Sequence, residues 1–174
     1  MIYNAGRIVS TTPVAQYRNS SIRTNIVSAL SGTEGQPLNL YYTCSGNYME
    51  VFNNTKNTET SVVSMHATFA YSSRLKYIIP TIVVSETKTS NDVTNTFTGC
   101  KALVLCKLKR LRYSFSFKDC PLISKESVQY IIDYSAATSA ITITLHPDAY
   151  ARLADDADIV VALEAQPLVS LVSA

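Results

Sequence analysis

Basic side chains crowd into one stretch of this sequence, between residues 101 and 118. Six of the 15 Lys and Arg residues fall within these 18 positions. The six are Lys101, Lys107, Lys109, Arg110, Arg112 and Lys118. Basic side chains neutralise phosphates, and the interleaved aromatic residues Tyr113, Phe115 and Phe117 could stack on bases. The stretch is therefore the candidate nucleic-acid-binding site. The alternative is that the aromatics belong to the core and the cations solvate an outer face.

A run of carboxylates is the second group that could do chemistry. Asp155, Asp156 and Asp158 lie close together, with Asp148 just before them. Clustered carboxylates can bind a hard cation such as calcium. We favour a solvated turn at this position, and a cation that bridges two subunits is the alternative. No cofactor is predicted.

Catalysis has no recognisable anchor in the sequence. The nucleophile-elbow, glycine-rich phosphate-loop, zinc-protease and EF-hand motifs are all missing. The two histidines, His66 and His146, have no matched nucleophile. The four cysteines lack the paired spacing of a zinc finger, so we expect free, buried thiols, with disulfides in a secreted protein as the alternative. The chain is predicted not to be an enzyme.

The composition favours one β-rich domain whose surface meets other protein. Of the 174 residues, 47% are hydrophobic and only 16% are charged, whereas free monomers usually carry more surface charge. Thr, Ser, Val and Ile are abundant, and the 11 Tyr residues also suit a pleated sheet. The net charge of +2 is lower than dedicated nucleic-acid-binding domains usually show. Nothing resembles a membrane span of about 18 apolar residues or a signal peptide.

The elements that must position these groups are mostly short strands. Strict alternation predicts half-buried strands over residues 111–117 and 140–146. Apolar runs predict further strands over residues 38–44, 48–52, 75–85, 100–108 and 159–163. Ser124 and Pro147 each begin a predicted short helix, and residues 60–71 are predicted as a short helix or an irregular crossing.

The number and order of these elements predict an architecture. About seven to nine strands, with two or three short helices between them, are typical of an all-β fold, an antiparallel β-sandwich or jelly roll with helices in the connections. Residues 1–37 are predicted to be an N-terminal arm or first strand, and residues 38–166 the jelly-roll domain. Residues 167–174 form an apolar, uncharged tail, which we expect to dock on a neighbour.

The C-terminal half also carries a family resemblance. Residues 115–122 run into Cys-Pro-Leu, a short helix ends near Gln129-Tyr130, and two predicted strands follow at 141–145 and 159–163. This order resembles the closing third of tymovirus-like plant-virus coat proteins. Upstream, residues 60–80 are similar to that family's helix before its third strand, although the family's longer middle region is missing here. The resemblance implies a viral jelly-roll subunit of an icosahedral RNA-virus shell.

The sequence therefore predicts a viral coat protein that self-assembles around RNA. Its expected partners are many copies of itself and viral RNA, with no membrane, and its expected location is the virion, with the host cytoplasm during assembly. Two alternatives stay open. One is a secreted or surface binding module of the adhesin or lectin kind, which predicts disulfides. The other is an RNA-binding silencing suppressor, which predicts salt-dependent RNA binding through residues 107–112.

Overall fold

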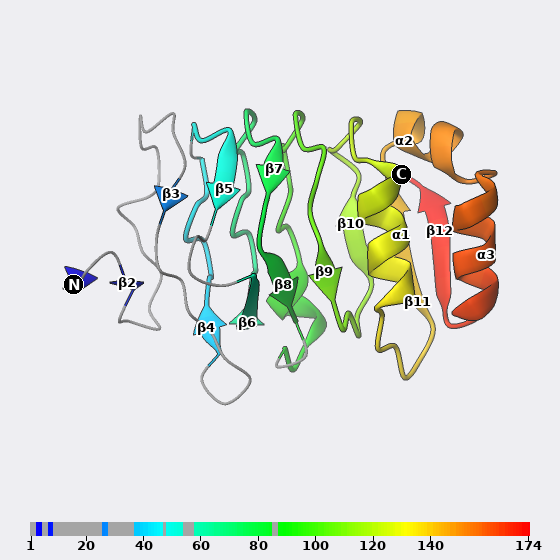
Figure 1. The fold of residues 1–174 in the computed structure, drawn as a ribbon, viewed down its shortest axis with the longest axis horizontal. Helices are drawn as coiled ribbons and strands as arrows, with labels where there is room; N and C mark the ends of the chain where they lie inside the picture. Colours follow the sequence, from blue (N-terminus) through cyan, green and yellow to red (C-terminus); the bar gives the residue numbers. More distant parts are fainter. Residues whose placement is uncertain are drawn as a thin grey trace.

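The computed structural model describes residues 37–46, 48–53, 58–84 and 87–174, together with strand residues 3–4, 7–8 and 26–27. Short strands lie side by side along the long axis, from the N-terminal to the C-terminal end (Figure 1). One sheet holds β3 (Ile26–Val27), β5 (Val51–Asn53) and β7 (Tyr77–Ile78). A second holds β4 (Leu38–Asn39), β6 (Glu59–Ser64), β8 (Thr81–Val83) and β9 (Leu108–Lys109). A third holds β10 (Phe115–Phe117), β11 (Ile141–Leu145) and β12 (Val169–Ser173).

All neighbours in these three sheets are parallel. Ile26 pairs with Phe52, and Phe52 with Ile78, so the chain returns to the same side after 26 residues. A chain that repeatedly stacks each coil on the one before forms a solenoid. Within the described residues, the antiparallel exception is the pair of two-residue strands β1 (Tyr3–Asn4) and β2 (Arg7–Ile8).

A third side of the coils consists of stacked turns instead of strands. These turns, at residues 41–46, 66–71 and 94–99, are called turns 1, 2 and 3 below. The N–H of Tyr42 in turn 1 donates to the His66 carbonyl at 3.0 Å, and the N–H of Ala67 in turn 2 donates to the Thr94 carbonyl at 3.0 Å. Every turn has left-handed backbone at the same two positions, which are Tyr42 and Gly46, Ala67 and Tyr71, and Asn95 and Gly99.

A stack of aromatic rings fills the interior behind these turns. Phe69 and Phe97 are stacked with centroids 5.7 Å apart, and Phe97 and Phe117 are stacked at 5.4 Å. All three side chains are buried. Aromatic pairs contribute about 0.5–1.5 kcal/mol beyond the area they bury, so this stack ties three successive coils together.

Buried polar side chains connect the same coils. The Thr68 hydroxyl donates to the Leu40 carbonyl of the preceding coil at 2.8 Å, and the Ser72 hydroxyl donates to the Cys44 carbonyl at 2.8 Å. One coil later, the Cys100 thiol takes the position of Ser72 and donates to a carbonyl at 3.0 Å. Each of these groups bonds a backbone carbonyl of the coil before it, and the Leu40 and Phe69 carbonyls also accept the N–H groups of Thr43 and Ser72.

Helices replace strands in the C-terminal coils. Helix α1 (Lys125–Asp133) lies between β10 and β11, and α2 (Pro147–Leu153) and α3 (Ala157–Ala165) lie between β11 and β12. The Ser124 hydroxyl caps α1 by accepting from the Ser127 N–H, and α1 packs on both β9 and α3. Parallel strands linked through helices are the usual α/β arrangement.

The predicted antiparallel β-sandwich is therefore wrong. The chain has mixed α/β character, with parallel sheets and helices that contribute to the core. Alternation of buried and exposed residues is the same in parallel and antiparallel strands, so it could not distinguish the two. The jelly roll followed from the strand count and from the family resemblance, and neither determines how the strands pair.

Several individual elements also differ from their prediction. Residues 159–163 belong to helix α3, where Asp156 caps the first turn; a short apolar run does not distinguish a strand from a buried helix. Buried Pro80 separates β7 and β8, which enter different sheets instead of one interrupted strand. Residues 60–71 divide into β6 and turn 2, and residues 100–108 are mostly irregular.

Other predictions are confirmed. Strand β11 buries Ile141, Ile143 and Leu145, as its alternation indicates, and β10 buries Phe115 and Phe117 with Ser116 exposed. Helices α1 and α2 begin after Ser124 and at Pro147. The tail 167–174 forms β12 beside β11 of the same chain, and its expected docking on a neighbour stays a prediction. Nearly all of the predicted arm, residues 1–37, lies outside the described residues.

Replacing Ser72 tests the buried polar connections between coils. We expect Ser72→Ala to lower the free energy of unfolding by about 1 kcal/mol, because one buried hydrogen bond is lost. Ser72→Cys should recover much of this loss, since Cys100 fills the same position one coil later. Ser139→Ala, at an exposed serine before β11, is the matched control. Chemical denaturation measures all four proteins, and equal stability of Ser72→Ala and the control would contradict the assignment.

Candidate binding site

The stacking of turns stops after turn 3. The fourth coil has extended backbone in β10 where the earlier coils have a turn, and among the described residues between 111 and 119 none has a positive φ. An extended strand and a turn space their backbone groups differently. The hydrogen bonds that join turn 1 to turn 2, and turn 2 to turn 3, therefore have no regular continuation into β10.

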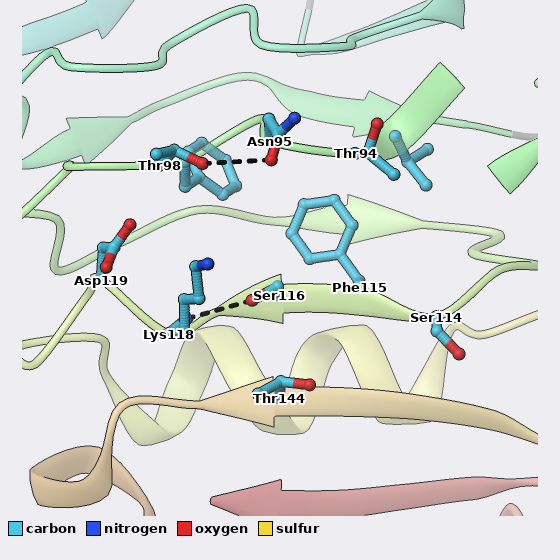
Figure 2. Close-up of a pocket in the computed structure, with 11 residues that line it drawn as sticks. Thr94, Asn95, Thr98, Ser114, Phe115, Ser116, Lys118, Asp119 and Thr144 are labelled. Carbon is cyan, nitrogen blue, oxygen red and sulfur yellow. Dashed lines mark hydrogen bonds between the residues drawn. The ribbon is translucent and has the colours of Figure 1, made fainter. Parts of the chain in front are cut away.

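A hollow of about 200 Å³ lies at this junction. Figure 2 shows Thr94, Asn95 and Thr98 from turn 3 on one wall. Ser116 of β10 and its flanking residues Ser114, Lys118 and Asp119 form the other wall. The Phe115 ring lies between these walls, and Thr144 of the next strand completes the rim. The hollow is thus polar at its mouth and aromatic at its base.

One wall carries two unused backbone donors. By analogy with turns 1 and 2, the N–H groups of Asn95, Phe97 and Gly99 point toward the next coil. Gly99 donates instead to the Asp119 carboxylate at 2.9 Å. The N–H groups of Asn95 and Phe97 have no hydrogen-bond partner among the described residues. We call these two groups the donor row.

The opposite wall carries two unused acceptors. The His146 N–H donates to the Phe117 carbonyl at 3.2 Å, so the backbone groups of Phe117 and Phe115 face β11. Alternation along β10 then directs the backbone groups of Ser114 and Ser116, their carbonyls and their N–H groups alike, toward turn 3. No described group donates to either carbonyl. We call this pair the acceptor row.

The charged residues at the rim balance each other. Lys118 extends from β10 toward the opposite wall in Figure 2, and its ammonium group has no ion-pair partner among the described side chains. Asp119 is its neighbour in the sequence and accepts from Gly99.

Gly99 itself has φ +71°, and a Cβ there would lie 3.2 Å from Cδ1 of Tyr71, so glycine suits this position.

Beyond the hollow, the outer face of the β10–β11–β12 sheet is uncharged and rich in hydroxyl groups. Thr144 pairs with Ser116 on one side and Val172 on the other. Thr142 donates its N–H to the Ser114 hydroxyl at 3.0 Å, and its own hydroxyl lies 3.4 Å from that of Ser170. The inner residues of these strands are buried with α1 in the core. The hollow therefore opens onto a polar sheet face.

Two of the six cations in the predicted nucleic-acid-binding stretch are engaged in ion pairs. Lys107 forms an ion pair with Glu126 at 2.7 Å, and Lys109 forms one with Glu59 at 3.0 Å. Lys101, Arg110, Arg112 and Lys118 are exposed. Of the six, Lys118 alone lines the hollow. The interleaved Phe115 and Phe117 rings belong to the core.

The predicted acidic cluster is used by the protein itself. Asp156 caps α3, its Oδ1 accepting from the Asp158 N–H at 3.1 Å. The Lys125 ammonium forms ion pairs with both Asp156 and Asp158, while Asp155 is exposed. Among the described residues, no group of three or more His, Cys, Asp or Glu side chains is placed to hold a metal ion.

The four cysteines are free and buried. Burial raises the pKa of the Cys100 thiol to about 12. The thiol pKa values of Cys44, Cys106 and Cys120 are also raised by burial. Reaction at sulfur requires the thiolate, so these groups are structural in the folded chain.

A repeated motif that positions the hollow was missed in the sequence. The motif has five positions: a hydroxyl residue, then an apolar or aromatic residue, then two variable residues, then a small polar residue. It recurs at residues 43–47, 68–72, 96–100 and 116–120. In the chain these read TCSGN, TFAYS, TFTGC and SFKDC. Spacings between successive motifs vary, which concealed the repeat. A search for internal similarity would have indicated a solenoid.

Comparisons with known proteins add no relative. No protein-family model, no curated protein and no solved structure matches the chain. In the part of the chain that the structure describes, no helix is both long and apolar enough to cross a membrane.

Thiol labelling tests the buried cysteines. Because burial raises all four pKa values, we expect the native protein to resist iodoacetamide at neutral pH. After denaturation without reductant, four labels per chain should appear by mass spectrometry. Fewer than four labels would show disulfides, as in the secreted alternative, and rapid native labelling would contradict the described burial.

Removing the α3 cap tests the role of the acidic cluster. We expect Asp156→Ala to lower the melting temperature by about 2 to 4 °C, because the first turn of α3 loses its cap. Asp155→Ala, one residue away, is the control and should change it little. Calcium is expected to stabilise neither protein, since Lys125 already pairs with the carboxylates.

The same variant should change the pH dependence. Lys125 holds the pKa of Asp156 below its ordinary value of 3.8, so the stabilisation is present above that pH and is lost as acid protonates the folded carboxylate. Hydrogen bonds to Asp158 and Asp156 raise the pKa of Lys125 above 10.5, so its contribution is lost only at higher pH. Melting curves of parent and Asp156→Ala should therefore converge in acid, and a constant difference would contradict the ion pair.

Proposed function

We propose that this chain is a structural, non-enzymatic protein that acts by assembling with copies of itself through strand β12. The observation that carries the proposal is the open edge of the third sheet. Among the strands that the structure describes, β12 pairs with β11 alone, and Figure 1 shows it as the last strand of the stack. An unpaired edge is a template for another strand.

The backbone of β12 has groups free to pair. Ile141 donates its N–H to the Leu168 carbonyl at 2.8 Å, and Ala174 donates to the Leu145 carbonyl at 2.9 Å. Alternation between these two bonds directs the backbone groups of Leu171 and Ser173 away from β11. Those groups form the open edge.

The side chains of the terminal coil favour a second copy as the occupant. Natural edge strands are usually protected by lysine, proline or a bulge, but β12 has the uncharged sequence Val-Ser-Leu-Val-Ser. Two such strands can pair without bringing like charges together. Apolar side chains nearby are exposed as well: Val160, Val161, Leu168 and Val172. Their burial would add to the backbone pairing.

The proposal keeps the predicted self-assembly but does not include the predicted virus shell. The coat-protein function, its RNA partner and its location in the virion stay predictions, and their structural basis, the jelly roll, is wrong. The ion pairs of Lys107 and Lys109 engage two of the cations that were expected to face RNA. The binding-module alternative predicted disulfides, whereas all four cysteines are free.

Sizing by light scattering across a range of concentrations tests the proposal. We expect a dimer of the 19.1 kDa chain. Ser173→Pro removes an edge-facing N–H without breaking a bond to β11, and Val172→Lys puts like charges on paired strands. Each should weaken association at least about tenfold, or about 1.4 kcal/mol.

The matched control makes the same apolar-to-lysine change elsewhere. Ile79→Lys alters a half-exposed side chain next to β7 and should leave association unchanged. A parent protein that stays monomeric at every concentration would sink the proposal. So would a dimer that both β12 variants form as tightly as the parent, with circular dichroism showing that the variants are folded.

A further inference from the structure

The hollow between turn 3 and β10 is a gap in a hydrogen-bond ladder that is otherwise continuous. Turn 1 joins turn 2 through N–H groups two residues apart, and turn 2 joins turn 3 in the same way. At the next step the donor row (Asn95 and Phe97) and the acceptor row (Ser114 and Ser116) lie on facing walls without bonding each other. Phe97 is buried, and a buried backbone N–H is nearly always paired. Asn95, Ser114 and Ser116 are exposed, so a bridging group could reach the gap from the outer face.

The room available limits the size of the bridging group. Inside the coil, Phe97 and Phe117 stack with centroids 5.4 Å apart, which is close to the spacing of adjacent strands. A complete extra strand therefore cannot enter at that point. The hollow of about 200 Å³ instead admits a small group from the outer face.

The two walls specify the chemistry of that group. It must accept hydrogen bonds from the donor row and donate to the acceptor row. An ionised carboxylate offers acceptors alone, and a phosphate would bring its negative charge against the Ser114 and Ser116 carbonyls and the Asp119 carboxylate. An amide has both a carbonyl oxygen and an N–H.

The charges and the apolar side chains that line the hollow also favour an uncharged ligand. Lys118 and Asp119 carry opposite charges side by side, and the other lining residues are neutral. The rings of Phe97 and Phe115 can contact the carbon atoms beside an amide. The remaining rim is hydroxyl and amide side chains, which adapt to either polarity.

We propose that the hollow binds an uncharged amide group of a partner polypeptide. The amide oxygen accepts from the donor row, and the amide N–H donates to the acceptor row. The amide belongs to either a peptide unit or a side-chain carboxamide, because both present the same two groups. This site is independent of the β12 edge.

Backbone amide resonances provide a direct test. Nitrogen-15 labelled Ser173→Pro protein, chosen to separate this test from self-association, is titrated with N-methylacetamide, acetamide, acetate or inorganic phosphate. We expect the first two to shift the Asn95 and Phe97 resonances saturably. The affinity of such small amides should be on the order of millimolar or weaker. The Gly99 resonance, whose N–H is already bonded to Asp119, should move less.

The probes separate the possible sources and the competing chemistry. A stronger response to N-methylacetamide supports a peptide unit, and a stronger response to acetamide supports a side-chain carboxamide. A larger response of the two donor resonances to acetate or phosphate would make the hollow an anion site and overturn the proposal. No response to either amide would also overturn it.

A filled hollow provides the control. Ser116→Leu places an apolar side chain on the β10 wall and should abolish the amide-induced shifts. Ser170→Leu makes the same change on the outer face of β12, away from the lining of the hollow, and should preserve them. Unchanged shifts in folded Ser116→Leu protein would place the amide elsewhere and refute the assignment.

Discussion

Hydrogen bonds between successive parallel coils are the constraint on which this structure depends. Each coil must present its backbone donors and acceptors at the height and spacing of the coil before it. The three turns satisfy this condition because they repeat left-handed backbone at the same two positions. The strands satisfy it because their registers return after a nearly constant length of chain. Phe69, Phe97 and Phe117 can stack only because the backbone brings them to the same place.

The same constraint explains where backbone hydrogen-bonding groups stay unpaired. Within a solenoid the backbone N–H and C=O groups bond to the neighbouring coils, so unpaired groups remain where the stack changes form or ends. The change from turn 3 to β10 leaves the donor and acceptor rows around the hollow. The end of the third sheet leaves the outward backbone groups of β12. Both features arise from backbone geometry, which is why neither depends on a catalytic side chain.

Side-chain chemistry contributes most where it replaces a missing backbone partner. Asp119 takes the Gly99 N–H that the next coil no longer accepts. Ser72 and Cys100 add bonds between coils, donating to carbonyls of the preceding coil from a hydroxyl and a thiol in equivalent positions. Asp156 caps α3, and Lys125 neutralises it. Several of the clustered charged residues, including Lys107, Lys109 and Asp158, likewise form ion pairs within the chain.

Local features could be predicted from the residues themselves, because their causes lie within a few positions. Ser124 and Pro147 mark real helix starts, and alternation in β11 gives its buried face. The free, buried thiols also agree with their irregular spacing. The helix over 159–163 was mistaken for a strand because a short apolar run has the same composition in either conformation. Parallel pairing and the hollow could not be predicted in this way. Both depend on which distant segments of the chain become neighbours. The alternation of buried and exposed residues in a strand is the same whichever strand lies beside it, so only the stacking of complete coils decides the pairing and the position of the hollow.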